Sequence, residues 1–198
     1  MSTDVKQPAG GQVLRIWAVS VAAALIVSLG VGACGGGSDG TAAPPSTTTA
    51  PREDLDMKPS DFRNLSTMTH VRGFYIDNRL GHLAEALRVA NSPTGGVYPV
   101  GTIVQLVPQE AMVKRRKGWN PTTHDWEFFF LGTSATGTEI VTRGAKETVN
   151  RFGGNCFSCH SAADAKWDLV CEQDHGCAPL PFGHDVFEAI QRADPRPR

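Results

Sequence analysis

The sequence has little charge imbalance and no long run of one charge. Its 198 residues carry 19 Lys and Arg against 20 Asp and Glu, which gives a formal net charge of −1. A nucleic-acid-binding surface needs a concentration of basic residues, so we expect no nucleic-acid partner. The sequence also has no internal repeat of the kind that builds solenoids or propellers. We therefore expect one folded domain of ordinary size.

The chain also lacks an apolar run long enough for a transmembrane helix, which needs about 20 residues. Its apolar segment spans residues 16–31 and follows a polar start with Lys6 and Arg15. This length, with small residues at the end, favours a secretory signal peptide over a permanent membrane helix. The run ends in Val-Gly-Ala-Cys at Cys34, which resembles the lipobox of bacterial lipoproteins.

Two processing routes follow from this ending. In the first, residues 1–33 are a lipoprotein signal peptide and Cys34 carries a lipid that anchors the protein in the bacterial cell membrane. In the second, an ordinary signal peptide is cut after Ala33. Residues 34–55 are rich in Gly, Ser, Thr and Pro, and we expect a disordered tether. Both routes place the domain 56–198 outside the cytoplasm, on the periplasmic or outer face, where thiols can be oxidised.

Cysteine is scarce, and two of the five cysteines belong to the most informative motif. Residues 156–160 read Cys-Phe-Ser-Cys-His, the C-x-x-C-H pattern of covalent c-type haem attachment. Cys156 and Cys159 are expected to form thioethers with the haem vinyl groups, and His160 to bind the iron as proximal ligand. The alternatives are a thioredoxin-like redox pair, which needs a βαβ unit, and half of a zinc site, which needs more soft ligands nearby.

Two further cysteines, Cys171 and Cys177, lie close together in the sequence. In an oxidising compartment we expect a disulfide between them. A bridge across a short loop removes little entropy from the unfolded chain, so it would mainly hold local shape. The alternative is a metal site that uses both thiolates with His175, which is one ligand short of the usual tetrahedral set.

The remaining pattern predicts an α+β domain, which is an antiparallel sheet with flanking helices. With the C-x-x-C-H motif, this domain is expected to carry one covalently bound haem. β-branched and aromatic runs indicate strands, and apolar residues on one face of a helical period indicate helices. The expected strands cover 70–76, 102–107, 111–113, 126–131 and 138–142, and the expected helices 59–62, 82–91, 147–152 and 185–192. We interpret the basic stretch 114–118 as a solvated hairpin tip.

Several short motifs, in their order, resemble the cytochrome P-460 family and its relative cytochrome c′-beta. They are THVRGFYID at 69–77, YPVGT at 98–102, MVK at 112–114, DWEFF at 125–129 and the late C-x-x-C-H motif. The resemblance covers roughly residues 69–165. It implies a β-rich domain, commonly a homodimer, that holds one haem c with an open distal side. Members of this family oxidise hydroxylamine or bind nitric oxide and similar small ligands.

One departure from the family bears on the chemistry. Enzymatic members carry a lysine that crosslinks to the haem just after the Gly-Thr pair of the second strand. Alignment on Gly101 and Thr102 puts Leu106 at that place, with no lysine within two residues of it. The resemblance therefore implies a haem without the crosslink and an apolar distal wall. The candidates for that wall are Leu106, Phe74, Phe128 and Phe130.

Three functions are open from the sequence. The first is a haem protein that binds nitric oxide or a similar small ligand. The second is an electron carrier with a redox partner protein, in which the chain supplies a sixth iron ligand. The third is an oxidoreductase that acts on hydroxylamine-type nitrogen compounds, whose catalytic residues the sequence does not identify. The candidate sixth ligands are Met68, His70, Met112 and His124.

Overall fold

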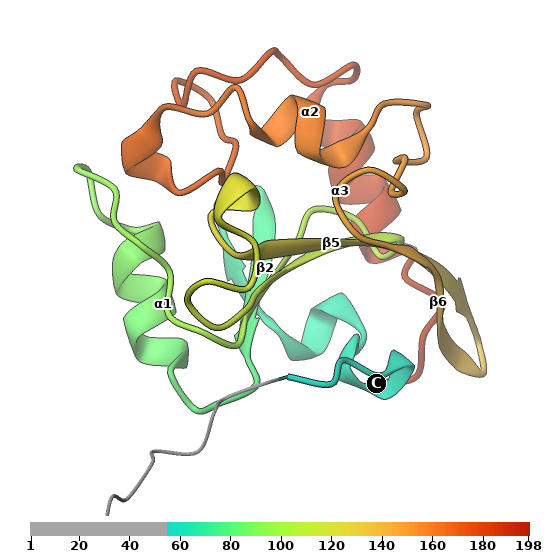
Figure 1. Ribbon diagram of the computed structural model, residues 1–198. Helices are drawn as coiled ribbons and strands as arrows, with labels where there is room; N and C mark the ends of the chain where they lie inside the picture. Colours follow the sequence, from blue (N-terminus) through green and yellow to red (C-terminus); the bar gives the residue numbers. More distant parts are fainter. Residues whose placement is uncertain (1–54) are drawn as a thin grey trace, which may run out of the picture. The chain divides into compact units, whose positions relative to one another are not determined.

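A single antiparallel sheet organises the chain. The computed structural model describes residues 55–198 (Figure 1), so the predicted signal peptide, Cys34 and almost all of the predicted tether lie outside the described residues. Six strands pair strictly in sequence order, which confirms the predicted α+β class with an antiparallel sheet. The strands are β1 (Thr69–Val71), β2 (Phe74–Asn78), β3 (Thr102–Gln105), β4 (Glu110–Lys114), β5 (Trp126–Ser134) and β6 (Gly137–Arg143).

Short helices surround this sheet. Within residues 55–198, no helix is long and apolar enough to cross a membrane. The α-helices are α1 (Leu83–Ala90), α2 (Cys156–His160) and α3 (His184–Arg192), and the 3-10 turns are η1 (Pro59–Asp61), η2 (Leu65–Thr67), η3 (Pro121–Thr123) and η4 (Ala165–Trp167). The helices predicted at 82–91 and 185–192 are confirmed as α1 and α3.

Each face of the sheet has its own apolar core. Strand β5 contributes to both, because alternate side chains point to opposite faces. Trp126 and Phe128 pack in the core that contains Cys156 of α2, whereas Phe129 and Leu131 pack in the core on the other face. Figure 1 shows α2 on one side of the sheet, and η1, η2 and the C-terminal end of the chain on the other. The strand predicted at 126–131 is therefore buried on both faces.

Two local predictions are wrong. The single strand expected at 70–76 is two strands, because Arg72 adopts a left-handed φ of 51° and turns the chain between β1 and β2. The helix expected at 147–152 does not form. Instead, the Asn150 side chain accepts hydrogen bonds from the backbone N–H groups of Phe152 and Gly154, at 3.0 and 2.9 Å. Asparagine competes in this way with helical hydrogen bonding.

The basic stretch 114–118 is a third correction. Lys114 and Arg115 retain only 5% and 7% of their exposure, so this part of the stretch is not a solvated tip. The aliphatic parts of such side chains pack readily, but a buried charge needs a partner. Lys114 finds one far along the chain, in a segment described below.

Phe129→Ala tests the core on the face away from α2. Phe129 is fully buried and its ring centroid lies 4.9 Å from that of Phe62. Truncation should lower the free energy of unfolding by about 3–5 kcal/mol, because it leaves a cavity. The matched control is Val141→Ala, at a half-exposed position of β6, which should change it by less than about 0.5 kcal/mol. Denaturant titration of both variants measures this, and equal effects would contradict the two-core arrangement.

Candidate functional site

The C-x-x-C-H motif forms α2, and Asn155 fixes the start of this helix. The Asn155 carboxamide oxygen accepts from the Ser158 backbone N–H at 2.8 Å, which caps the helix. Its Nδ2 group donates to the carbonyls of Ala145 and Thr148, at 3.0 and 3.2 Å. The cap therefore ties the motif to the chain that leaves β6.

The two motif cysteines are free and differ in their surroundings. Cys156 is buried in the core beside β5, and Cys159 is exposed. Burial raises the pKa of the Cys156 thiol to about 12, with a further contribution from the nearby Glu110 carboxylate. Burial also raises the pKa of Glu110. Cys156 thus stays a neutral thiol at ordinary pH, on the same helix turn as Cys159.

His160 is oriented by one hydrogen bond. Its Nδ1 lies 2.7 Å from the Leu169 carbonyl oxygen. A carbonyl only accepts, so Nδ1 carries the proton and Nε2 keeps its lone pair. Burial lowers the pKa of the imidazole, which favours this neutral form. The ring also packs against Phe128, with 5.4 Å between centroids.

The residues that hold the segment around Leu169 were missed by sequence reasoning. The preceding residue, Asp168, forms an ion pair with Lys114 at 2.7 Å, and both side chains are buried. The Trp126 indole N–H donates to the Asp168 carbonyl at 2.7 Å, and the Tyr98 backbone N–H donates to the Asp168 carboxylate at 2.9 Å. Burial raises the pKa of the Tyr98 hydroxyl. The sequence signal that was available is Lys114 itself, which directly follows the apolar residues Ala111, Met112 and Val113.

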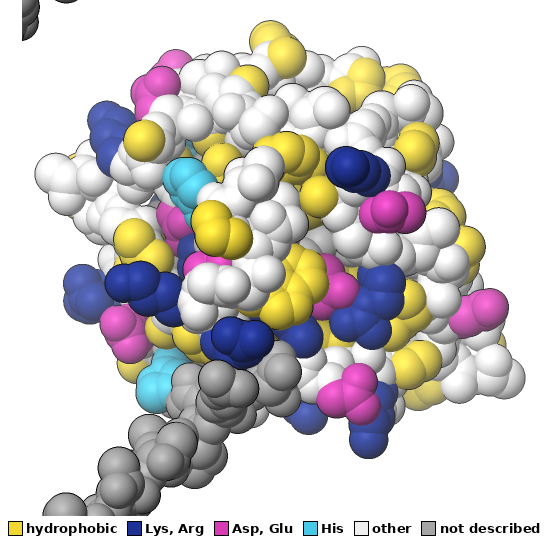
Figure 2. Space-filling model, in the orientation of Figure 1, with side chains coloured by type: hydrophobic (Ala, Val, Ile, Leu, Met, Phe, Trp, Pro, Cys, Tyr) yellow, Lys and Arg dark blue, Asp and Glu magenta, His cyan; other side chains and the backbone are white. Residues whose placement is uncertain are grey.

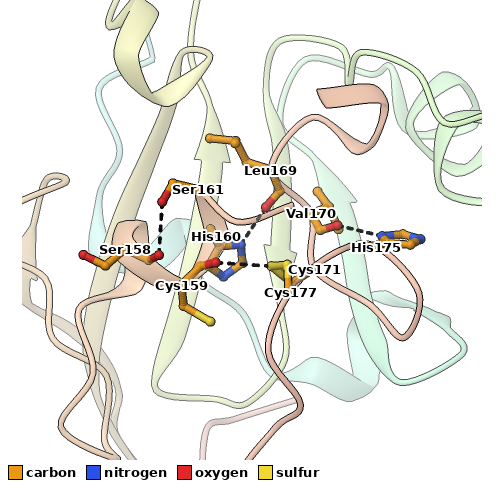
Figure 3. The surroundings of a disulfide bond; sticks show 9 residues. All are labelled: Ser158, Cys159, His160, Ser161, Leu169, Val170, Cys171, His175 and Cys177. Atoms are coloured by element: carbon orange, nitrogen blue, oxygen red, sulfur yellow. Dashed lines mark hydrogen bonds between the residues drawn. A yellow bond between two sulfur atoms is a disulfide. The ribbon is translucent and has the colours of Figure 1, made fainter. Parts of the chain in front are cut away.

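The predicted disulfide between Cys171 and Cys177 is confirmed. Figure 3 shows it beside α2, where the Cys171 sulfur lies 3.9 Å from the Cys159 carbonyl oxygen. Among residues 55–198, no group of three or more His, Cys, Asp or Glu side chains could hold a metal ion, which argues against the alternative site with His175.

His175 repeats the arrangement of His160 in the loop that the disulfide closes. Its Nδ1 donates to the Val170 carbonyl at 2.7 Å, so the two histidines bond to successive carbonyls of one segment (Figure 3). The His175 ring stacks on Trp167 at 3.8 Å between centroids, beside a surface hollow of about 290 Å³. His175 differs from His160 in lying outside the cysteine motif.

The predicted distal wall is partly gathered on one face. Phe74, Leu106 and Phe128 pack with Cys156 in the same core, whereas Phe130 is half-buried and outside it. Phe128 packs directly against His160, so it contributes to the surroundings of the proposed iron ligand itself. The distal role of these residues stays a prediction.

The four candidate sixth ligands are divided by the sheet. Met112 packs in the core that contains Cys156, and it pairs with Phe128 in the sheet register. Met68 packs against the core of the opposite face. The His70 ring lies tilted against Tyr75, which by strand alternation points away from the face of Phe74 and Ile76. His124 is partly exposed, in a left-handed turn. Met112 is therefore the candidate placed on the same face as the motif.

A cluster of partly exposed aromatic rings borders the motif. Phe152, which lies just before α2, has ring contacts with Phe182 and Phe187 at 5.4 and 6.0 Å. Phe182 is 49% exposed and Leu180 is 52% exposed.

The donor set fits covalent haem attachment. Cys156 and Cys159 are free thiols one helical turn apart, and the following histidine presents an unprotonated Nε2. Bonding of the second ring nitrogen to a backbone carbonyl is the usual support of a metal-binding imidazole. No protein-family model matches the chain, and no curated protein or solved structure matches it either. Its function is therefore inferred from this geometry and from the sequence motif.

Thiol labelling tests the described difference between the cysteines. In haem-free protein at pH 8, an alkylating reagent should modify Cys159 first and Cys156 on the order of 100-fold more slowly, because a buried thiol with a raised pKa forms little thiolate. Fragment-ion mass spectrometry locates the label. Cys171 and Cys177 should stay unlabelled without reductant and serve as the internal control. Equal rates at Cys156 and Cys159 would contradict the buried position.

Proposed function

We propose that the protein is an extracytoplasmic haem c protein that binds nitric oxide or a similar small ligand, with His160 as proximal iron ligand. The observation that carries this is the His160 geometry: Nδ1 donates to Leu169 and leaves Nε2 for iron, directly after two free thiols. Haem supplies an iron atom that takes a small ligand on the side opposite the histidine.

The chain's own residues would hold and tune that group. Cys156 and Cys159 would bond the porphyrin edge, and the carbonyl of Leu169 would keep the imidazole in the metal-binding tautomer. The apolar side chains of Phe74 and Leu106, on the same face as Cys156, would limit hydrogen bonding to a bound ligand and raise the reduction potential. The exposed rings of Phe152 and Phe182 offer apolar surface beside the motif.

The position of Lys114 supports ligand binding over hydroxylamine oxidation. Lys114 is the nearest lysine to Leu106 in the sequence and follows Met112 on the motif-facing side of β4. Its Nζ donates to both Asp168 carboxylate oxygens and to the His124 carbonyl, at 2.7–2.8 Å. All three protons are used, so this amine is not free to crosslink to haem.

Electron transfer is the second candidate, because Met112 lies on the motif-facing side of the sheet. A thioether from Met112 above the iron would give a six-coordinate haem of high reduction potential. This role requires a redox partner protein. Basic and acidic side chains are interspersed on the face drawn in Figure 2, so that face offers no strong field to steer a charged partner.

The cellular setting belongs to the same proposal. A lipid on Cys34 would anchor the protein in the membrane, and residues 34–55 would set its distance from the surface. The resemblance to cytochrome P-460 proteins further suggests a homodimer. Covalent haem attachment requires export, so the signal sequence and the C-x-x-C-H motif are mutually consistent.

His160→Ala tests the proposal in protein from a bacterial host that matures c-type cytochromes. The wild-type protein should be red and carry one covalent haem by mass spectrometry. His160→Ala should retain the thioether-bound haem but lose its proximal ligand, which changes the ferrous spectrum. The matched control is His175→Ala, which removes a histidine with the same kind of carbonyl bond and should leave the spectrum unchanged. Colourless wild-type protein, or an unchanged His160→Ala spectrum, would refute the proposal.

The ferrous spectrum of the wild-type protein separates the three functions. A five-coordinate, high-spin haem that takes up nitric oxide supports the first. A six-coordinate, low-spin haem in both redox states supports electron transfer, and Met112→Ala should then convert it to five-coordinate. A broad, red-shifted Soret band would reveal a lysine crosslink, overturn our reading of Lys114 and favour the oxidoreductase.

A further inference from the structure

We propose that the buried Lys114–Asp168 ion pair positions His160. By holding Asp168, the residue before Leu169, it would fix the Leu169 carbonyl and thereby set the orientation of the imidazole and the strength with which Nε2 donates to iron. The consequence at the iron rests on the proposed function. The orientation of His160 by the ion pair does not, because it concerns the chain alone. Lys114 and Asp168 act through Leu169, so they are positioning residues rather than iron ligands.

Both charged groups of the ion pair are hydrogen-bonded and buried. The Lys114 ammonium donates to both Asp168 carboxylate oxygens, at 2.8 and 2.7 Å, and to the His124 carbonyl at 2.7 Å. The side chains of Lys114 and Asp168 keep only 6% and 3% of their exposure. Such a pair has little freedom, because any movement of the carboxylate would leave a buried ammonium without its counter-charge.

The sheet holds Asp168 at two further points. The Tyr98 N–H donates to the carboxylate at 2.9 Å, and the Trp126 indole N–H donates to the backbone carbonyl of Asp168 at 2.7 Å. The Trp126 ring also lies 5.0 Å from the Lys114 ammonium, in the geometry of a cation–π contact. Residues from β4, β5 and the chain before β3 therefore converge on this one residue.

The backbone at this point is strained. Asp168 and Leu169 have φ values of 51° and 63°, both in the left-handed region. Aspartate tolerates this conformation, but a branched, buried leucine does so only when its surroundings enforce it, at a cost of order 1–3 kcal/mol. Leu169 bears the carbonyl that accepts from His160 at 2.7 Å. The strain is thus located at the acceptor of the proposed iron ligand.

The choice of residues at 114 and 168 also points to positioning. A buried ion pair is often no more stabilising than an apolar pair of similar volume. An apolar pair would fill the space but would leave residue 168, which precedes Leu169, held by fewer bonds. A loosened carbonyl weakens the bond to Nδ1–H, reduces the donor strength of Nε2 and thereby raises the reduction potential of the iron.

The test is the charge-balanced double variant Lys114→Met/Asp168→Asn. Asparagine tolerates the left-handed conformation and can still accept from Tyr98, so the variant removes the ion pair without changing net charge. The matched control is Arg196→Met/Asp194→Asn, which removes another buried pair, 2.7 Å apart. That pair is bound to Phe62 and Leu65 rather than to the His160 segment. Trp126→Phe is a milder second variant that removes the hydrogen bond to the Asp168 carbonyl and keeps an aromatic ring beside Lys114.

Three measured quantities are expected to change together. In haem-free protein, the nitrogen-15 NMR signals of His160 should lose the single Nδ1–H tautomer in the Lys114→Met/Asp168→Asn variant and keep it in the control. In haem-loaded protein, the ratio of reduced to oxidised haem at a fixed ambient potential should rise about tenfold, a shift of about 59 mV for one electron. The iron–histidine stretch should fall in frequency, and Trp126→Phe should move all three quantities less, in the same direction.

The outcomes separate this inference from the proposed function. If wild-type protein carries no haem, the function fails, and the NMR comparison still decides whether the ion pair orients His160. If wild-type protein carries haem but neither test variant differs from the control, the positioning role is refuted alone. A Lys114→Met/Asp168→Asn variant that does not fold leaves Trp126→Phe to decide, and an unchanged tautomer and potential there would refute the role as well.

Discussion

The hydrogen bond between His160 and the Leu169 carbonyl connects everything else in the candidate site. It ends a short chain of contacts that begins in the sheet: Lys114 of β4 and Trp126 of β5 hold Asp168, and Asp168 precedes Leu169. The sheet is thereby connected, through Asp168 and Leu169, to a side chain that lies on a separate helix. This link adds a directional bond to the apolar contacts of α2 with the sheet, which are far less directional than hydrogen bonds.

This arrangement divides the molecule into a support and a site. The six strands and the core on their far face supply rigidity, and they contain Phe129 and Leu131, which have no direct contact with the motif. The segment from α2 to Cys177 supplies the chemistry and is tightened by the disulfide. Precise placement of a binding group on a rigid scaffold is what a tuned metal site needs.

Features that depend on near neighbours could be predicted from the sequence. β-branched and aromatic runs predicted β5 and β6, the helical period predicted α1 and α3, and closeness in the sequence predicted the disulfide. The break at Arg72 could not be predicted, because it depends on a left-handed φ in an otherwise β-forming stretch. The role of Lys114 was equally invisible, since its partner lies 54 residues away. Long-range polar partners leave no local pattern, and the burial of 114–115 was misjudged for that reason.

The strictly sequential strand order has a consequence for the order in which the protein folds and matures. Every pairing in the sheet joins neighbours along the chain, and the last strand ends at Arg143, before Cys156 begins α2. Pairings of low sequence separation close quickly, so a meander assembles without waiting for distant segments. A polypeptide that crosses a membrane with its amino end first can therefore complete its sheet before the attachment cysteines have crossed. The maturation machinery would meet those cysteines beside a surface that is already built.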